Sequence, residues 1–339
     1  MAFPDLTALR EFAGWKAARV PEAPGPTADA EGLRRAYLGL LKLALCDLAG
    51  TRTASVSRLI DGSVASRELS GEDRRLRAAG LDWPLHGLTM VGLNRLDDLQ
   101  ACVESVVRDG VEGDLIEAGA WRGGASILMR ATLDALGAHA RTVHVADSFQ
   151  GFPAADELRE LNEIDFLAVP VEEVRDSFAR FGLEQGVRFV PGFFERTLPG
   201  LAGTRWAVIR LDGDTYEATR AALEALYPGL SVGGYVIVDD YGVMEREECR
   251  RAVDEYRERH GIDDPLEPVD WTCVRWRRSD AGPVGPAEPR PAPAEARGEA
   301  LPRPREPHVP TGRELELERE VAALRERLGG RSWRRRLTR

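Results

Sequence analysis

From residue 113 onward, short apolar segments alternate with amphipathic ones, and this alternation limits the fold more than any other feature of the sequence. The apolar segments have the length of strands, and the segments between them carry apolar residues at helical spacing. We expect strands at 115–118, 142–146, 187–190, 206–211, 234–238 and 274–277, and helices at 126–136, 171–181, 216–226 and 249–260. Strands and helices that alternate over short connections form a mostly parallel sheet with helices on both faces. The sequence therefore predicts an α/β fold over residues 113–278.

The part of the chain before this sheet has a different pattern. Residues 1–32 are mixed in composition and are taken as an N-terminal extension. Residues 33–112 are predicted to form a helical cap or lid, because apolar residues recur at helical spacing in 33–48 and again in 94–108.

The part after the sheet is not typical of a globular domain. Residues 279–312 are rich in Pro, Ala, Glu and Arg and have almost no large apolar side chains, so we expect a disordered linker. Residues 313–339 are predicted to be a short helix with a basic end. Apolar residues follow heptad spacing there at Leu317, Val321, Leu324 and Leu328.

Composition excludes several classes of protein. The formal net charge of −10 argues against general nucleic-acid binding. No apolar run reaches the roughly 18 residues of a membrane helix, and no basic region followed by an apolar segment marks a secretory signal. The four cysteines are scattered, as is usual for free thiols in a reducing compartment. We therefore expect a cytoplasmic protein without a membrane span.

The first expected strand leads into a glycine-rich turn, Glu-Ala-Gly-Ala-Trp-Arg-Gly-Gly at 117–124. Such a strand–turn–helix holds nucleotide-like cofactors in α/β proteins, although the Gly-x-Gly-x-x-Gly fingerprint is absent. Asp147 ends the next strand, where an acid commonly binds ribose hydroxyls, and Ser148 adds a donor beside it. Gly192 opens a segment with two phenylalanines that could line an adenine pocket. A tight turn with a capping acid and core phenylalanines would explain the same residues.

Three aspartates follow two strands of one strand–helix–strand unit: Asp212 after the first strand, and Asp239 and Asp240 after the second. Both ends emerge at one edge of a sheet, and neighbouring strands lie about 5 Å apart, so the carboxylates would crowd one site. Such a cluster is costly without a cation, and oxygen ligands favour Mg²⁺, Mn²⁺ or Ca²⁺ over zinc. Alternatively, the last two acids only cap a loop. We expect Asp214 to cap the helix that begins at 216.

These motifs resemble the macrocin O-methyltransferase (TylF-like) family. The resemblance rests on residues 89–96, 117–124, 146–149, 187–194, 210–219, 226–228 and 233–241. It implies a Rossmann-like class I methyltransferase sheet with an N-terminal helical cap, and S-adenosylmethionine and Mg²⁺ as cofactors. It also implies O-methylation of a sugar hydroxyl on a glycosylated natural product, as in antibiotic biosynthesis, or on a glycan.

The resemblance assigns roles to individual residues. It implies cofactor contacts for Thr89, Met90, Glu117, Ala118, Gly119, Ala120, Trp121, Asp147 and Ser148, and Gly192 joins this set through its place after the strand that ends at 190. It implies metal ligation by Asp212, Asp239 and Asp240, with Asp212 also the candidate catalytic base. Some relatives place a His near the acceptor sugar where this sequence has Arg159, so the acceptor pocket is expected to differ.

Two other functions fit parts of the sequence. Asp147 would suit a nicotinamide cofactor equally well, so a nicotinamide-dependent oxidoreductase is a rival, although the missing fingerprint and the acid cluster speak against it. The second rival is a methyltransferase-fold scaffold that recruits glycan-assembly enzymes through the C-terminal helix. Residues 330–334 resemble the tails of some bacterial glycosyltransferases. We also expect a homo-oligomer, with the C-terminal helix as a candidate partner site.

Overall fold

The computed structural model describes residues 29–58, 64–71, 74–153, 166–242 and 248–279. The expected Pro-rich linker from residue 280, the C-terminal helix, Arg159 and most of the N-terminal extension lie outside the described residues. Among the helices that are described, none combines the length and apolarity needed to cross a membrane.

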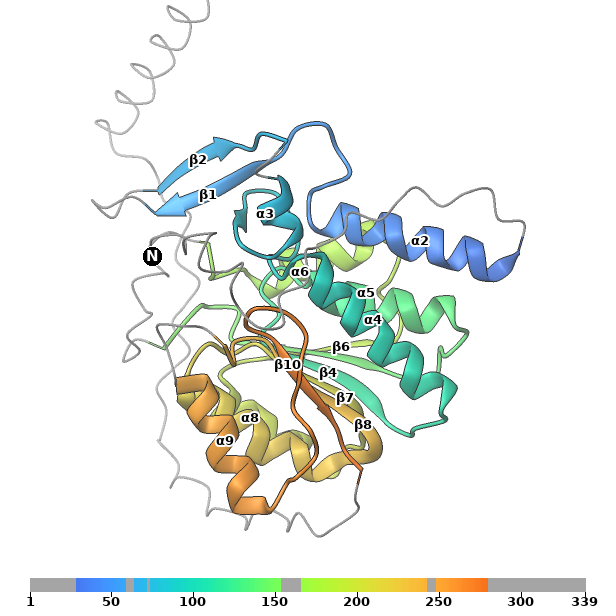
Figure 1. Ribbon diagram of the computed structural model, residues 1–339, viewed down its shortest axis with the longest axis vertical. Helices are drawn as coiled ribbons and strands as arrows, with labels where there is room; N and C mark the ends of the chain where they lie inside the picture. Colours follow the sequence, from blue (N-terminus) through green and yellow to red (C-terminus); the bar gives the residue numbers. More distant parts are fainter. Residues whose placement is uncertain (1–28, 59–63, 72–73, 154–165, 243–247, 280–339) are drawn as a thin grey trace, which may run out of the picture. The chain divides into compact units, whose positions relative to one another are not determined.

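A seven-stranded sheet forms the centre of the described chain (Figure 1). Its strand order is β6-β5-β4-β7-β8-β10-β9. The strands are β4 (Asp114–Ala118), β5 (Val143–Asp147), β6 (Val187–Pro191), β7 (Trp206–Leu211), β8 (Leu230–Val238), β9 (Glu267–Pro268) and β10 (Val274–Arg277). The first five in the spatial order run parallel, while β10 is antiparallel to both β8 and β9. This sheet confirms the predicted mostly parallel, Rossmann-like fold.

The strand order reverses between β4 and β7. The chain passes outward from β4 to β5 and β6, and then returns to the other side of β4 to form β7 and β8. In open α/β sheets, ligands bind outside the carboxyl ends of the strands at such a switch point. The topology therefore places the candidate site beyond residues 118 and 211.

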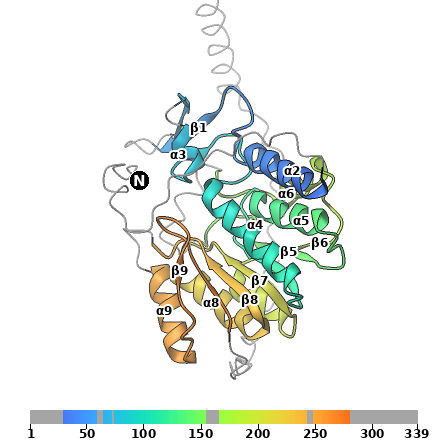
Figure 2. The ribbon, with the colours of Figure 1, turned by 45° about the vertical axis from the view of Figure 1, so that its right-hand side comes forward.

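Helices cover both faces of the sheet, and the two figures agree on which helix lies where (Figures 1 and 2). The helices are α2 (Ala30–Leu45), α3 (Arg74–Ala78), α4 (Gly92–Arg108), α5 (Gly124–Ala135), α6 (Val171–Arg180), α7 (Phe194–Thr197), α8 (Tyr216–Leu226) and α9 (Glu248–His260), with short 3-10 turns at Leu198–Leu201 and Tyr227–Gly229. Helices α2, α4, α5 and α6 share one apolar core with the sheet, and α7, α8 and α9 share another.

Alternation along the strands produces these two cores. Successive side chains of a strand point to opposite faces. In β4, Leu115 belongs to the core under α4 and α5, while Ile116 belongs to the core under α8 and α9. In β7, Val208 and Ile209 divide in the same way. Because both faces are covered, these strands are apolar along most of their length, with Glu117 in β4 and Arg210 in β7 as exceptions, which is why the sequence predicts them well.

The segment predicted as a helical cap is not purely helical. It contains a three-stranded antiparallel sheet of β1 (Ala54–Arg58), β2 (Val64–Glu68) and β3 (Trp83–Pro84), in the order β2-β1-β3. These strands are short and largely polar, and β3 falls in a stretch that reads as a loop, so no apolar alternation marks them. The expected boundary between this segment and the sheet at residue 113 stays a prediction.

Candidate functional site

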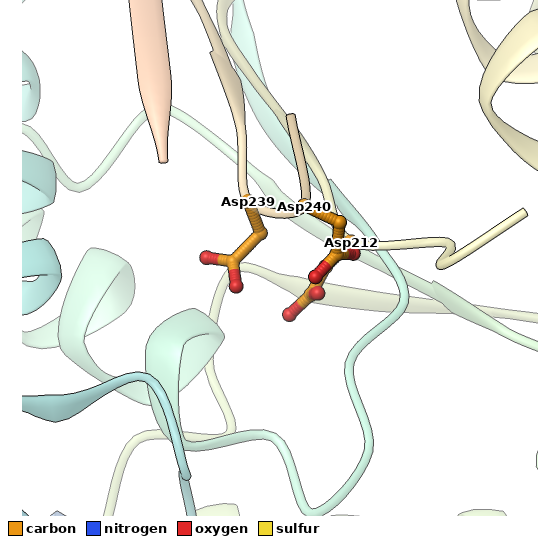
Figure 3. Close-up of side chains that lie close together, drawn as sticks. All are labelled: Asp212, Asp239 and Asp240. Atoms are coloured by element: carbon orange, nitrogen blue, oxygen red, sulfur yellow. The ribbon is translucent and has the colours of Figure 1, made fainter. Parts of the chain in front are cut away.

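The three predicted acids converge at the ends of β7 and β8. Their backbones extend the parallel ladder, because the N–H of Asp212 donates to Ala118 O at 2.8 Å and the N–H of Asp239 donates to Leu211 O at 2.9 Å. Asp212, Asp239 and Asp240 each offer a carboxylate oxygen within 4.8 Å of the others (Figure 3). The expectation that these carboxylates crowd one site is therefore confirmed.

Two buried arginines partly neutralise the acids. Arg210, in β7, donates through Nη1 to Glu117 Oε1 at 2.6 Å and to Asp212 Oδ2 at 2.9 Å, and through Nη2 to Asp239. Arg95, in the first turn of α4, donates to the other oxygen of Asp239. Arg210 is 2% exposed and Arg95 is 7% exposed, so neither charge is well hydrated.

Neither arginine donates a hydrogen bond to Asp240. Its Oδ2 atom is shielded from solvent and has no hydrogen-bond partner among the described residues. Burial raises the pKa of Asp240 well above its ordinary value, and the carboxylates of Asp214, Asp212 and Asp239 raise it further, while Arg95 opposes the rise. Burial also raises the pKa of Asp212, with Asp239 adding to the effect and Arg210 opposing it. Asp240 is therefore the one acid of the three with a solvent-shielded oxygen that no donor among the described residues satisfies.

The glycine-rich turn lies directly on this acid cluster. Gly119 has a φ of 99°, and a Cβ there would come within 1.8 Å of the carbonyl oxygen of Asp212. The carboxylate of Asp147 fixes the turn, because Oδ2 accepts the N–H groups of Ala120 at 2.8 Å and of Trp121 at 3.0 Å. Oδ1 accepts the N–H of Phe149 at 2.8 Å. Burial raises the pKa of Asp147, and these backbone hydrogen bonds oppose the rise.

The other residues expected at the cofactor lie around the same turn. The N–H of Gly192 donates to Asp147 O at 2.9 Å, which brings the end of β6 beside the end of β5. Ser148 closes its own loop by donating to Gly151 O at 2.6 Å. A Cβ on Gly124 would lie 2.8 Å from Thr89 Cβ, so Thr89 packs against the start of α5. Met90 is half-buried next to it.

Glu117 lies deeper than a ligand contact would suggest. It is 1% exposed, and its two oxygens accept hydrogen bonds from Arg210 and from Ser126 of α5. Burial raises its pKa to about 7, with Asp212 adding to the rise while Arg210 and Ser126 oppose it. Its direct cofactor contact stays a prediction, and the structure gives it a second role as a buried partner of Arg210.

Sequence reasoning missed both arginines. Arg210 left a signal, because a charged residue inside the otherwise apolar strand 206–211 requires a buried partner. No feature of the sequence marks Arg95 as buried, since an arginine in an amphipathic helix ordinarily faces solvent. Asp270, which pairs with Arg95 at 2.7 Å, was also missed, because it lies in the loop before β10 and an aspartate in a loop is ordinarily exposed.

A glycine-rich turn at the end of β4, an acid at the end of β5 and an acid cluster at the ends of β7 and β8 are typical of α/β proteins that bind a nucleotide-like cofactor at the switch point. The chain matches the Macrocin-O-methyltransferase (TylF) family over residues 40–278 and belongs to that family. It is therefore an O-methyltransferase, and the methyltransferase class implies S-adenosylmethionine as the methyl donor. Membership of this family excludes the rival interpretation as a nicotinamide-dependent oxidoreductase.

Two characterised relatives and one solved structure are closely similar. The chain is 49% identical over 260 residues to 8-demethyl-8-(2,3-dimethoxy-alpha-L-rhamnosyl)-tetracenomycin-C 4'-O-methyltransferase of Streptomyces olivaceus, covering 74% of this chain and 95% of the relative. It is 43% identical over 254 residues to mycinamicin III 3''-O-methyltransferase of Micromonospora griseorubida, and the match covers 72% of this chain and 96% of the relative. The structure of the O-methyltransferase NovP superposes with a TM-score of 0.63 at 42% identity, covering 73% of this chain and all of NovP.

Proposed function

We propose that this enzyme transfers a methyl group from S-adenosylmethionine to a sugar hydroxyl of a glycosylated natural product, with assistance from a divalent cation. The names of two relatives support a sugar hydroxyl as the acceptor, since one is named for a rhamnosyl-tetracenomycin and the other for mycinamicin III. The unpartnered oxygen of Asp240, inside a cluster of three acids, supports a divalent cation bound at this cluster.

The residues present fit a hard divalent cation. All the candidate ligand atoms are carboxylate oxygens, which Mg²⁺ prefers. The carboxylate of Asp239 already accepts two hydrogen bonds, but each carboxylate oxygen has two lone-pair positions and can still ligate. Asp212, Asp239 and Asp240 would hold the ion, which when bound would lower the pKa of a coordinated hydroxyl and orient it.

The protein's own groups then account for the remaining steps. The turn at 119–121, held by Asp147, would place the sulfonium donor against Asp212. The acceptor oxygen forms a bond to the methyl carbon as the bond from that carbon to sulfur breaks, which gives a methyl ether and S-adenosylhomocysteine. Asp212 would accept the hydroxyl proton as general base. Alignment of oxygen, carbon and sulfur removes much of the entropic barrier.

The acids can be tested by methyl transfer to rhamnosylated acceptors, detected by mass spectrometry. Asp212→Asn should lower kcat by about 10²–10⁴-fold, the usual contribution of a general base. Asp240→Asn should remove the response of the rate to added Mg²⁺ and to EDTA. Asp176→Asn, on the exposed face of α6, is the matched control. Full activity of the Asp212 variant in EDTA would refute the metal-assisted mechanism.

The acceptor can be identified separately. A panel of glycosylated compounds that differ in sugar and in free hydroxyl should show methylation at one sugar position. Methylation only of non-sugar phenols would contradict the sugar assignment and leave the methyltransferase assignment intact. Homo-oligomer formation and a partner for the C-terminal helix stay predictions, which light scattering of the full chain can test.

A further inference from the structure

Arg95 reaches the acid cluster from outside the main sheet. It lies in the first turn of α4, five residues after Met90, and its side chain is almost fully buried. Its Nη1 donates to Asp239, and its Nε donates to Asp270 Oδ2 at 2.7 Å. One guanidinium therefore links the end of β8 to the loop before β10 by two separate N–H groups.

Asp270 anchors this arginine to the backbone. Its Oδ1 atom accepts the N–H groups of Thr272 at 3.1 Å and of Cys273 at 2.9 Å, which leaves Oδ2 for Arg95. Asp270 is itself buried, so neither member of the pair can move into solvent. Charge-assisted hydrogen bonds of this kind fix orientation as well as adding energy.

Asp239 is consequently held on both sides. Arg210 donates to its Oδ1 and Arg95 donates to its Oδ2, while its carbonyl oxygen accepts a hydrogen bond from the Thr272 hydroxyl. With one bond on each oxygen, the carboxylate cannot rotate without breaking a buried ion pair, which is strongly unfavourable. Each oxygen nevertheless keeps a lone pair for a cation.

We propose that Arg95 is a positioning residue for the cation site: with Asp270 behind it, it fixes the orientation in which Asp239 presents its free lone pairs to the ion. This inference rests on the metal site of the proposed function. The direction in which Mg²⁺ affinity changes when Arg95 is removed distinguishes a positioning role from a purely electrostatic one. By charge alone, removing a nearby cation would tighten Mg²⁺ binding. By positioning, removing it frees Asp239 to rotate and weakens Mg²⁺ binding.

Arg95→Gln in the full chain separates these two effects. Calorimetric titration with Mg²⁺, without an acceptor, should show affinity lowered by about 10–100-fold, the usual effect of losing a residue that orients a metal ligand. Arg95→Lys should remain weakened, because one ammonium cannot reproduce the planar fork that joins Asp239 and Asp270. Unchanged or tighter Mg²⁺ binding by Arg95→Gln would overturn the proposal.

Two further variants complete the test. Arg275→Gln is the matched control: Arg275 also ties α4 to β10, through Asp98 at 3.1 Å, but contacts none of the three cluster acids. It should bind Mg²⁺ as the wild type does. If Arg95→Gln does not fold, Asp270→Asn removes the anchor instead and should also weaken binding. A wild type that binds no Mg²⁺ would refute the metal site itself, whereas equal binding by wild type, Arg95→Gln and Asp270→Asn would refute only the positioning role.

Discussion

At the residue scale, Gly119 connects the cofactor turn to the acid cluster. The clash that a Cβ would make is with a backbone carbonyl, which cannot move aside as the end of a flexible side chain could. We predict that Gly119→Ala separates the turn from Asp212, lowering both the free energy of unfolding and methyl transfer. Urea unfolding and turnover measure the two effects.

Gly110 offers a matched control for this substitution. It also has a positive φ, 65°, but nothing lies within 4 Å of a Cβ built on it. Gly110→Ala should therefore cost only the left-handed strain, about 1–2 kcal/mol, with turnover unchanged. Equal losses in the two variants would show that conformation alone, and not the contact with Asp212, requires glycine at 119.

Glu117 should make stability depend on pH in the direction opposite to most carboxylates. Its pKa rises from 4.5 to about 7 in the folded protein, first because it is buried. Between those values the unfolded chain has released a proton that the folded chain still holds, so stability falls as pH rises from about 4.5 to about 7. The full loss is about 3 kcal/mol, from 1.36 kcal/mol per pKa unit.

Glu117→Gln should remove this fall. We expect the free energy of unfolding of the variant, relative to wild type, to increase as denaturant titrations move from pH 4.5 to pH 7.5. Glu184→Gln, at an exposed glutamate, controls for the loss of one negative charge. A variant that loses stability relative to wild type over that range would show that Glu117 is ionised and stabilised by Arg210 throughout.

At the scale of elements, the sequence predicts what local pattern determines. Strands such as β7, which is buried along its whole length, carry an apolar run, and an acid directly after such a run must lie at the edge of the sheet. That is why the acid cluster could be predicted from spacing alone. The start of β8 was predicted four residues late, since Gly233 and Gly234 read as a turn while the strand continues through them.

Elements that depend on tertiary contacts could not be predicted in this way. β1 has the sequence Ala-Ser-Val-Ser-Arg, and its pairing with β2 and β3 is supported by little apolar alternation. Helix α4 was predicted, but not that its first turn carries Arg95 into the site. The direction of that side chain depends on how α4 packs on the sheet, which periodicity does not encode.

At the scale of the whole molecule, one topological feature brings the parts of the site together. Because the strand order reverses beside β4, the turn after β4 meets the acids after β7 and β8, while α4 approaches over the same edge. The site combines three acids with two guanidinium groups, and one oxygen of Asp240 is left without a hydrogen-bond partner among the described residues. A cation that binds there should therefore stabilise the folded chain as a whole.

The last prediction tests this coupling by thermal unfolding. A ligand at 100 times its Kd adds about 2.7 kcal/mol to stability, so Mg²⁺ should raise the Tm of the wild type by several degrees at constant ionic strength. Asp240→Asn should be more stable than wild type in EDTA, because it relieves the repulsion between Asp240 and the carboxylates of Asp214, Asp212 and Asp239, and it should respond little to Mg²⁺. Asp176→Asn should respond as the wild type does. An Asp240 variant that is less stable in EDTA, or that keeps the full Mg²⁺ response, would mean that the protein's own arginines already balance the cluster.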